Sequence, residues 1–230
     1  MVQYTEWRSI SDGSIISSIP DSEIYLQDDW EDNKLTNRDG SGTTVFNGVT
    51  GVYRPEWDKQ EENPQVENGV VTLEGDAIVT SDVDFSEAIN NQTVTWEFDY
   101  NIPSGDSSDW VTVQLFAETD EWNDLENRPN LDRAYFVGIR LASGSGGLRF
   151  HRADTGGDFT ELFTGNPSTS GTIVVEREAN GDWELFLDSS SVGSTNDNTY
   201  TDAKHVGIAS RDGSFQATQP ILEMDKLKIS

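Results

Sequence analysis

The stretch TVTWEFDYNIPSGDSSDWVTVQLFA, residues 93–117, carries the clearest structural pattern of this 230-residue chain. Apolar and polar residues alternate on both sides of a central segment rich in Gly, Ser and Asp. A period of two is typical of a β-strand with one buried face, and the central segment is typical of a turn. The stretch therefore predicts a long β-hairpin near the middle of a β-sandwich. The residues expected to face the core are Val94, Trp96, Phe98, Tyr100, Ile102, Val111, Val113, Leu115 and Ala117, with Thr112, Gln114 and Phe116 on the opposite side.

Short runs of the same kind recur along the rest of the chain, with almost no helical periodicity. VVTLE (70–74) and AIVTS (77–81) predict a second, tight hairpin, and residues 84–90 predict one helical turn. The dipeptide Asn180-Gly181 predicts the turn between two later strands. Together these patterns predict an all-β fold, an antiparallel sandwich or jelly roll.

The balance of charge is strongly acidic: 42 Asp and Glu residues against 15 Lys and Arg give a net charge of −27. Such self-repulsion destabilises a compact fold in dilute salt and is used by halophilic proteins, because molar salt screens charges beyond about 3 Å. Nucleic acid is an unsuitable partner, since phosphate binding requires basic patches. The chain contains no Cys, which excludes disulfides. We therefore expect a folded domain from a high-salt environment.

Residues 1–22 differ from the rest, with Ser and Ile recurring around Asp12-Gly13 and Pro20. They form either an edge strand with a frayed terminus or an arm that packs against a neighbouring subunit. The second alternative predicts a homo-oligomer, with an arm over 1–22 and a sandwich over 23–230. No segment reaches the roughly 20 apolar residues of a membrane span, and the start has neither the basic nor the apolar region of a secretory signal. We expect no membrane insertion.

The order of these segments resembles the concanavalin A-like jelly-roll family, which includes laminin-G-type domains, legume lectins and laminarinase-type glucanases. The resemblance covers roughly residues 23–229 and implies the fold more directly than any activity. The matching pieces are LQDDWED (26–32), NGVVTLEGDAIVTSDVDF (68–85), TVTWEFDYNI (93–102), AYFVGIRL (134–141), VVEREANGDWELFLDSSSVGS (174–194), HVGIAS (205–210) and EMDKLKI (223–229).

Within this resemblance, WEFDYN (96–101) is similar to the catalytic strand of laminarinase-type glucanases. Glu97 and Asp99 match two of its carboxylates, but Asn101 stands where the acid/base Glu is expected. A neutral amide neither donates nor retrieves the proton of a leaving group. The remaining pattern contains no other catalytic motif, so we expect no enzyme activity.

Three tryptophans are candidates for binding a carbohydrate or receptor: Trp57, Trp110 and Trp122. Each lies in a polar or acidic context. Each either packs into the core or presents a flat apolar face that can stack on a sugar ring.

A metal site is a further hypothesis. Asp28 and Asp29 follow the first expected strand, and Asp225 lies in the last, where terminal strands of a sandwich often meet. Related carbohydrate-binding sandwiches resemble this in holding a structural calcium, for which carboxylates are suitable ligands. The alternative is that all three are ordinary surface carboxylates, so no cofactor is expected to be required.

The function that combines these features is that of a virion protein. The resembled fold usually works outside cells by binding glycans or proteins, whereas the chain begins with Met and has no export signal. A capsid turret or tail-fibre protein of a haloarchaeal tailed virus is made in the cytoplasm and released by lysis, and contacts host-surface glycan or glycoprotein. Residues 1–22 would dock to other virion proteins. The main alternative is a secreted halophilic carbohydrate-binding module. A glycoside hydrolase is a third, less favoured alternative.

Overall fold

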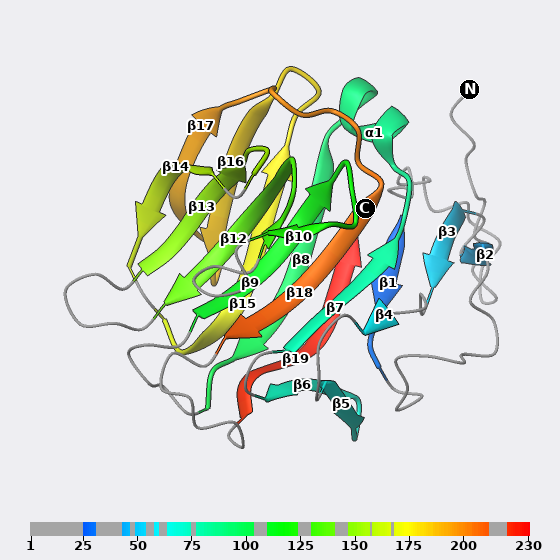
Figure 1. Ribbon diagram of the computed structural model, residues 1–230. Coiled ribbons are helices and arrows are strands. Elements are labelled where there is room, and N and C mark those ends of the chain that lie inside the picture. The colour runs from blue at the N-terminus through cyan, green and yellow to red at the C-terminus, as the bar shows by residue number, and fades with distance from the viewer. Residues whose placement is uncertain are drawn as a thin grey trace, which may run out of the picture.

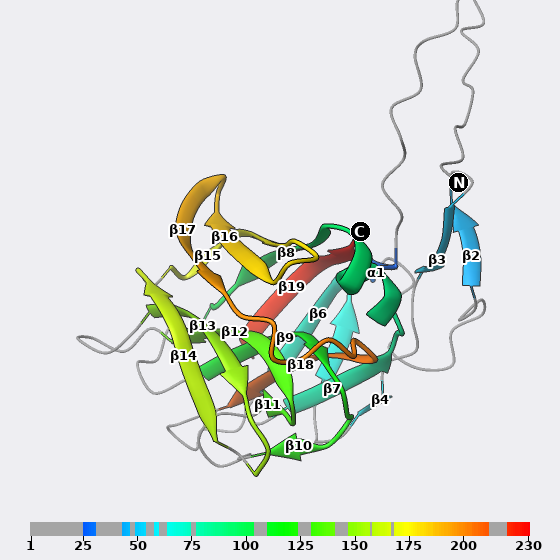
Figure 2. The same cartoon turned by 90° about the horizontal axis from the view of Figure 1, so that it is seen from above.

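Alternating apolar and polar residues form β-strands along most of the described chain, and the strands stack as two layers. Figure 2 shows these layers edge-on, and Figure 1 shows one of them face-on. The computed structural model describes residues 25–30, 43–46, 49–53, 58–59, 64–74, 77–103, 110–123, 130–140, 147–156, 158–166, 168–211 and 220–230. The predicted arm over residues 1–22 lies outside these ranges. Among the residues described, no helix is long and apolar enough to cross a membrane.

The larger layer is a ten-stranded sheet with the order β17-β16-β15-β8-β19-β1-β3-β2, in which β6 also pairs with β19 and β5 pairs with β6. All its pairings are antiparallel except that between β1 and β3. The strands are β1 (Leu26–Asp28), β2 (Thr43–Phe46), β3 (Val49–Tyr53), β5 (Pro64–Glu67), β6 (Val70–Glu74), β8 (Val94–Asn101), β15 (Ser170–Arg177), β16 (Asp182–Leu187), β17 (Ser190–Asn196) and β19 (Pro220–Ile229).

The second layer is a seven-stranded antiparallel sheet with the order β14-β13-β12-β9-β18-β7-β4. A two-stranded ribbon of β10 (Trp122–Asn123) and β11 (Asn130–Leu131) lies on its outer side (Figure 2), and the helix α1 (Ser86–Asn91) joins β7 to β8. The seven strands are β4 (Asp58–Lys59), β7 (Ala77–Asp82), β9 (Trp110–Ala117), β12 (Ala134–Arg140), β13 (Gly147–Ala153), β14 (Phe159–Gly165) and β18 (His205–Arg211). The predicted all-β jelly-roll sandwich is confirmed.

Residues 93–117 form two strands but not the predicted hairpin. β8 pairs with β15 and β19, whereas β9 pairs with β12 and β18, so the two strands belong to opposite sheets. Trp96 on β8 reaches across the core, where its indole nitrogen donates to the backbone oxygen of Leu115 at 2.8 Å and its ring stacks on Phe116. The hairpin prediction was wrong because each strand has one apolar face, and the two faces are buried by meeting across the sandwich.

The predicted hairpin of residues 70–74 and 77–81 fails for the same reason. β6 pairs with β5 and β19, while β7 pairs with β18 and β4 in the other sheet. The true hairpin is β5–β6, and its two-residue turn is Asn68-Gly69. Both turn residues have positive φ, 55° and 75°, as the tight turns of twisted hairpins require.

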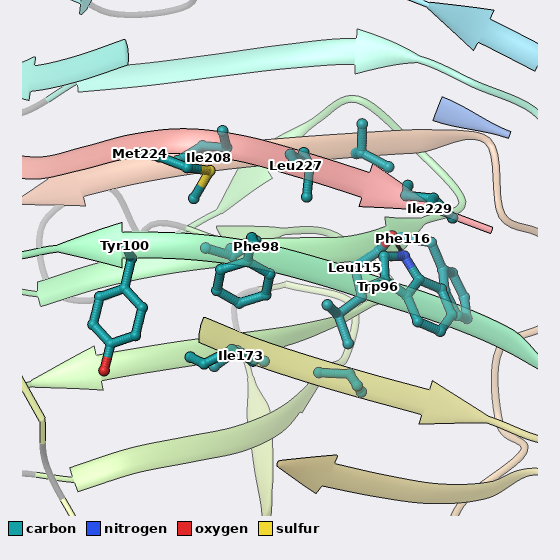
Figure 3. Close-up of a cluster of buried hydrophobic side chains, with 14 of the residues drawn as sticks. Trp96, Phe98, Tyr100, Leu115, Phe116, Ile173, Ile208, Met224, Leu227 and Ile229 are labelled. Atoms are coloured by element: carbon teal, nitrogen blue, oxygen red, sulfur yellow. Dashed lines mark hydrogen bonds between the residues drawn. The ribbon is translucent and has the colours of Figure 1, made fainter. Parts of the chain in front are cut away.

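The core between the sheets is built around β8, whose alternation is as predicted (Figure 3). On β9 the alternation breaks at a β-bulge, because Phe116 pairs with Tyr135 while Gln114 pairs with Phe136. Leu115 is therefore the extra residue, and Leu115 and Phe116 both face the core. The predictions that Phe116 points outward and that Ala117 faces the main core were both wrong, because periodicity does not reveal a bulge; Ala117 belongs to a smaller cluster with Phe136.

Arg177 at the end of β15 is fully buried and ties this core to α1. Its guanidinium donates to the backbone oxygen of Ile89 in α1 and to the side-chain oxygen of Asn198, and lies 5.4 Å from the ring centroid of Trp183. Burial lowers the pKa of Arg177, because it penalises the charged form. The helix itself confirms the helical turn predicted for residues 84–90.

Candidate functional site

Trp110 lies at the start of β9 on the outer face of the seven-stranded sheet, and not in the core between the sheets. Its ring lies over Gly138 on β12, where an added Cβ would meet Trp110 Cζ2 at 2.8 Å. The indole nitrogen donates to Thr112 Oγ1 at 3.0 Å. Only 3% of the residue is exposed. The Trp110 ring therefore lies outside the main core but beneath neighbouring side chains. It supports those side chains and is not itself open for a ligand to stack on.

Three arginines gather around this ring. Arg140 on β12 and Arg211 on β18 are the residues directly opposite Trp110 on its two neighbouring strands, so the three side chains share the outer face. Arg149 on β13 places its guanidinium carbon 5.9 Å from the Trp110 ring centroid. Its Nη1 also donates to Glu161 Oε2 at 2.9 Å. We call Trp110, Arg140, Arg149 and Arg211 the Trp110–arginine cluster.

The cluster continues into a stack of rings along the same face. Phe136 and His151 stack with centroids 4.9 Å apart, and Phe159 meets His151 edge-on at 5.3 Å. Leu131 of β11 joins Phe136 in a second, smaller core on the outer side of the sheet, and its backbone nitrogen donates to Gln114 Oε1 at 3.3 Å. These contacts hold the face around the arginines in a fixed arrangement.

The three arginines are each half-buried. A guanidinium presents up to five N–H donors in a planar fork, and an aromatic base beneath it adds a cation–π attraction. Such a surface offers directed hydrogen bonds to hydroxyl, carboxylate or sulfate oxygens. The four described residues of the cluster therefore offer hydrogen-bond donors and aromatic surface, which are the elements of a binding site.

The other two candidate tryptophans are not placed at this cluster. Trp57 lies outside the described residues. Trp122 begins β10 and pairs in backbone register with Leu131, while its side chain lies outside the description. The binding roles of both stay predictions.

The polar residues of WEFDYN, Glu97, Asp99 and Asn101, lie on the outer face of the ten-stranded sheet, the opposite side of the molecule from the cluster. Glu97 accepts from Lys226 Nζ at 2.5 Å, and Asp99 accepts from the hydroxyl of Thr172. The amide of Asn101 donates to Glu223 Oε2 at 2.7 Å.

The local partners make this strand a polar, cross-linked sheet face. Two carboxylates engaged by a lysine and a threonine, with an amide at the third position, do not form the pair of a proton-donating acid and a free nucleophile that a retaining glycosidase uses.

Two of the three aspartates of the metal hypothesis, Asp28 and Asp225, differ in their surroundings. Asp28 is fully buried and accepts from the backbone nitrogen of Trp30 at 2.9 Å, whereas Asp225 is exposed on β19. Burial, followed by the charge of nearby Asp99, raises the pKa of Asp225. Within the described ranges no group of three or more His, Cys, Asp or Glu residues is arranged to hold a metal ion. Calcium binding by Asp28, Asp29 and Asp225 therefore stays a prediction without a formed site.

A hollow of about 420 Å³ opens over the ends of β15, β16 and β17. Two of its four carboxylates are already engaged, because Asp182 accepts from Asn196 at 2.6 Å and Glu184 accepts from Ser191 at 2.9 Å. In a chain of net charge −27 an acidic hollow is an expected feature of the surface. Its lining is Glu176, Glu178, Asp182, Trp183, Glu184, Ser194, Thr195 and Asn196.

A separate ionic network joins the two sheets at one end of the sandwich. Arg152 of β13 donates to Asp154 at 2.9 Å and to Asp197 at 2.6 Å, beyond the end of β17. Tyr200 donates to Asp154 at 2.8 Å, and Tyr135 donates to Asp197 at 2.5 Å. Each carboxylate is satisfied by these donors, so the network holds the fold together and leaves no free group for a ligand.

The arginines of the cluster were not among the residues selected from the sequence. Arg140, Arg149 and Arg211 lie in or at the ends of correctly predicted strands, but they are 9 to 71 positions apart. Their meeting depends on the order β13-β12-β9-β18, which periodicity does not specify. The available signal was that Arg140 and Arg211 each end a strand and Arg149 lies within one, in a chain with few basic residues.

The two packed antiparallel sheets define a jelly-roll β-sandwich domain. No family model and no curated protein matches the sequence. Solved structures match the fold at low identity. The carbohydrate-binding module CBM66 from Bacillus subtilis is 11% identical, with a TM-score of 0.50 over 74% of this chain and 91% of that one.

Two further structures extend the similarity. The CBM2 module of the evolved Dit protein of Lactobacillus casei BL23 phage J-1 is 10% identical, with a TM-score of 0.53 over 90% of this chain and 94% of that one. The exoplasmic/lumenal domain of VIP36, in a Ca²⁺- and Man-bound form, is 9% identical, with a TM-score of 0.57 over 76% and 83%. At these identities the likenesses establish the fold alone.

Proposed function

We propose that this chain is a non-catalytic carbohydrate-binding module that binds saccharide at the Trp110–arginine cluster. The observation that carries the proposal is the convergence of three partly buried arginines around one covered tryptophan, with Arg149 5.9 Å from its ring centroid. Planar guanidinium donors match the oxygen acceptors of a saccharide, and donors that a rigid sheet already orients lose less conformational freedom on binding.

The comparisons support this proposal through the proteins they name. Two of the similar structures are carbohydrate-binding modules, and the VIP36 domain was solved with Man and Ca²⁺ bound. The fold therefore suits carbohydrate binding in unrelated sequences. The site on this chain is proposed from its own residues.

The test is binding of the folded chain to a panel of soluble polysaccharides in molar salt. Trp110→Leu removes the ring that supports the arginines and should weaken binding about tenfold or more. Phe186→Leu, on the outer face of the other sheet, is the matched aromatic control and should bind like wild type. Circular dichroism and urea unfolding check that both variants fold.

The other outcomes are equally informative. Glu184→Gln changes the acidic hollow, so a loss of binding in this variant alone would move the site there. A folded wild-type chain that binds no polysaccharide at any concentration tested would refute the proposal. Chelation with EDTA should leave binding unchanged, whereas its loss would favour a bound calcium.

We further propose that the module acts on the surface of a halophilic virus, as a capsid turret or tail-fibre type of protein contacting host-surface glycan or glycoprotein. The net charge of −27 supports a high-salt setting, and the likeness to a module of a phage protein supports a virion role. A secreted halophilic binding module is the alternative.

Light scattering in molar salt distinguishes the two roles. A homo-oligomer that becomes monomeric when residues 1–22 are removed would support docking to itself and to other virion proteins through that arm. A monomer at all concentrations would favour the secreted module.

A further inference from the structure

We propose that Asn91 is the attachment site of an N-linked glycan. The tripeptide Asn91-Gln92-Thr93 has the pattern Asn-X-Ser/Thr, with X other than Pro, that marks an N-glycosylation acceptor. This pattern occurs once in the 230 residues. The proposal is independent of the Trp110–arginine cluster, because it concerns a saccharide that is covalently attached to the chain.

The tripeptide lies at the surface, where helix α1 ends and the chain enters β8. Asn91 is the last residue of α1, and Gln92 and Thr93 lead into Val94 at the start of the strand. All three residues of the tripeptide are exposed, whereas Ile89 and Val94 close by are fully buried. A transferase therefore reaches the tripeptide without any separation of the two sheets.

The backbone presents the two reacting side chains together. Gln92 is extended, with φ of −150° and ψ of 177°. In an extended chain the two residues that flank a given residue point to the same side, which places the Asn91 amide and the Thr93 hydroxyl on one side of the backbone. Within the described ranges the Thr93 hydroxyl makes no hydrogen bond, so it is available to the enzyme.

The amide of Asn91 is held by its own helix. Its nitrogen donates to the backbone oxygen of Glu87 at 2.7 Å, so unwinding the last turn of α1 releases it, and helix ends fray readily. The neighbouring Asn90 differs, because its amide donates to the backbone oxygen of Ser86 and also to that of Thr201 at 3.1 Å. That second bond ties Asn90 to another segment of the chain. Of the two adjacent asparagines, the one in the acceptor pattern is therefore the more easily released.

The chain contains one further Asn that is followed two positions later by Ser or Thr, in Asn166-Pro167-Ser168. Proline locks φ at about −65° and does not adopt the extended φ of −150° that Gln92 has. Asn166 therefore serves as an internal negative control.

The reaction is the transfer of a glycosyl group from a lipid-linked oligosaccharide phosphate. A bond forms between Asn91 Nδ2 and the anomeric carbon of the first sugar, while the bond between that carbon and the phosphate oxygen breaks. The amide nitrogen loses one proton and the lipid phosphate leaves, so neither an oxidant nor a reductant is required.

The glycan would lie at the end of the sandwich opposite to the Trp110–arginine cluster. Helix α1 adjoins the end of β9, because Phe85 N donates to the backbone oxygen of Ala203 and Lys204 N donates to that of Ala117. The eight residues of β9 from Trp110 to Ala117 span roughly 23 Å at about 3.3 Å per residue. Figure 1 shows α1 at one end of the strands. Attachment at Asn91 therefore does not obstruct the cluster.

The modification also bears on where the protein works. N-glycosylation takes place on chains that are exported. A native chain that carries the glycan would favour the secreted module over a protein that stays in the cytoplasm until lysis.

The test is secretion of the full chain from a haloarchaeal host that N-glycosylates its surface proteins, followed by intact-mass and peptide mass spectrometry. A flexible C-terminal tail with a second Asn-Gln-Thr reports that the transferase has acted on the chain. We expect glycan on Asn91 and on the tail, and none on Asn166.

Variants assign the modification to the tripeptide. Asn91→Gln and Thr93→Ala should each lose the glycan at residue 91 and keep the one on the tail, whereas Thr93→Ser should retain both. Circular dichroism should be the same for all three variants, because the exchanged side chains are exposed.

Two results would overturn the inference. Glycan on the tail but not on Asn91 would show that the end of α1 is not an acceptor. Modification of Asn91 that persists at the same level in Thr93→Ala would show that the tripeptide does not direct it. Both results leave the proposed carbohydrate binding standing, since that is measured separately on the unmodified chain.

Discussion

Replacing Trp183 tests whether the aromatic cluster between the sheets is the main source of stability. Trp183 on β16 is 1% exposed, and its indole nitrogen donates to the backbone oxygen of Asp197 at 2.9 Å. Its ring centroid lies close to those of four other buried rings, at 4.7 to 6.1 Å. These rings are Trp96, Phe116, Tyr135 and Phe150.

The expected cost follows from these contacts. Trp183→Phe removes the hydrogen bond, worth about 1 kcal/mol, and roughly 40 Å² of apolar contact, worth about 1 kcal/mol at 25 cal/mol/Å². The sum of about 2 kcal/mol corresponds to a change of roughly 30-fold in the folding equilibrium. Trp183→Ala also leaves a cavity and should cost about 3–5 kcal/mol.

The measurement is urea unfolding in molar salt, followed by circular dichroism so that the loss of one tryptophan does not affect the signal. With an m-value of about 3 kcal/mol/M, Trp183→Phe should lower the midpoint by about 0.7 M. Phe186→Leu, outside the core on the same strand, should lose less than about 1 kcal/mol. A change below about 0.5 kcal/mol for Trp183→Phe, at an unchanged m-value, would refute the central role of this ring.

Four further results are expected. Burial raises the pKa of Asp197, but hydrogen bonds from Tyr135 and Thr199 and the charge of Arg152 outweigh it and lower the pKa overall, so the stability that Asp197 contributes should disappear as pH falls below about 4 in acid unfolding. Burial and the hydrogen bond to Asp154 raise the pKa of Tyr200 to about 12, so its contribution should persist below pH 10 and disappear as pH rises towards 12 in alkaline unfolding. Gly193→Ala places a Cβ 2.7 Å from the ring of Phe163 and should cost about 1–3 kcal/mol, whereas an unchanged melting temperature would contradict this close contact between β17 and β14. Transfer from molar to about 0.01 M salt should lower the melting temperature, because the Debye length grows to about 30 Å and exposes the net charge of −27 to its own repulsion.

Local pattern was sufficient to predict the strands and several of their neighbours. The alternation over residues 93–101 predicted which side of β8 is buried, and Asn180-Gly181 predicted the turn that pairs β15 with β16. β12 likewise pairs with β13, its neighbour in the sequence. In each case the partners are adjacent in sequence and the information is carried by a few neighbouring residues.

The predictions that were wrong depended on contacts between residues that are far apart in the sequence. A strand with one apolar face can pair with its neighbour or face it across a core, and the sequence of β8 and β9 is compatible with both. The bulge at Leu115 and the meeting of Arg140 with Arg211 also arise from strand order, which is a property of the whole sandwich. Of the four residues of the Trp110–arginine cluster, the sequence therefore predicted Trp110 alone.

The position of β19 in its sheet constrains how the protein is made. β19 lies between β8 and β1, and its residue Glu223 bonds to Asn101, 122 positions earlier. During translation the long apolar side of β8 leaves the ribosome well before this partner is synthesised. Contacts of such sequence separation form slowly, and an unpaired strand edge invites aggregation while it waits. We expect folding to be completed only after β19 has emerged, with nascent chains depending on chaperones until then.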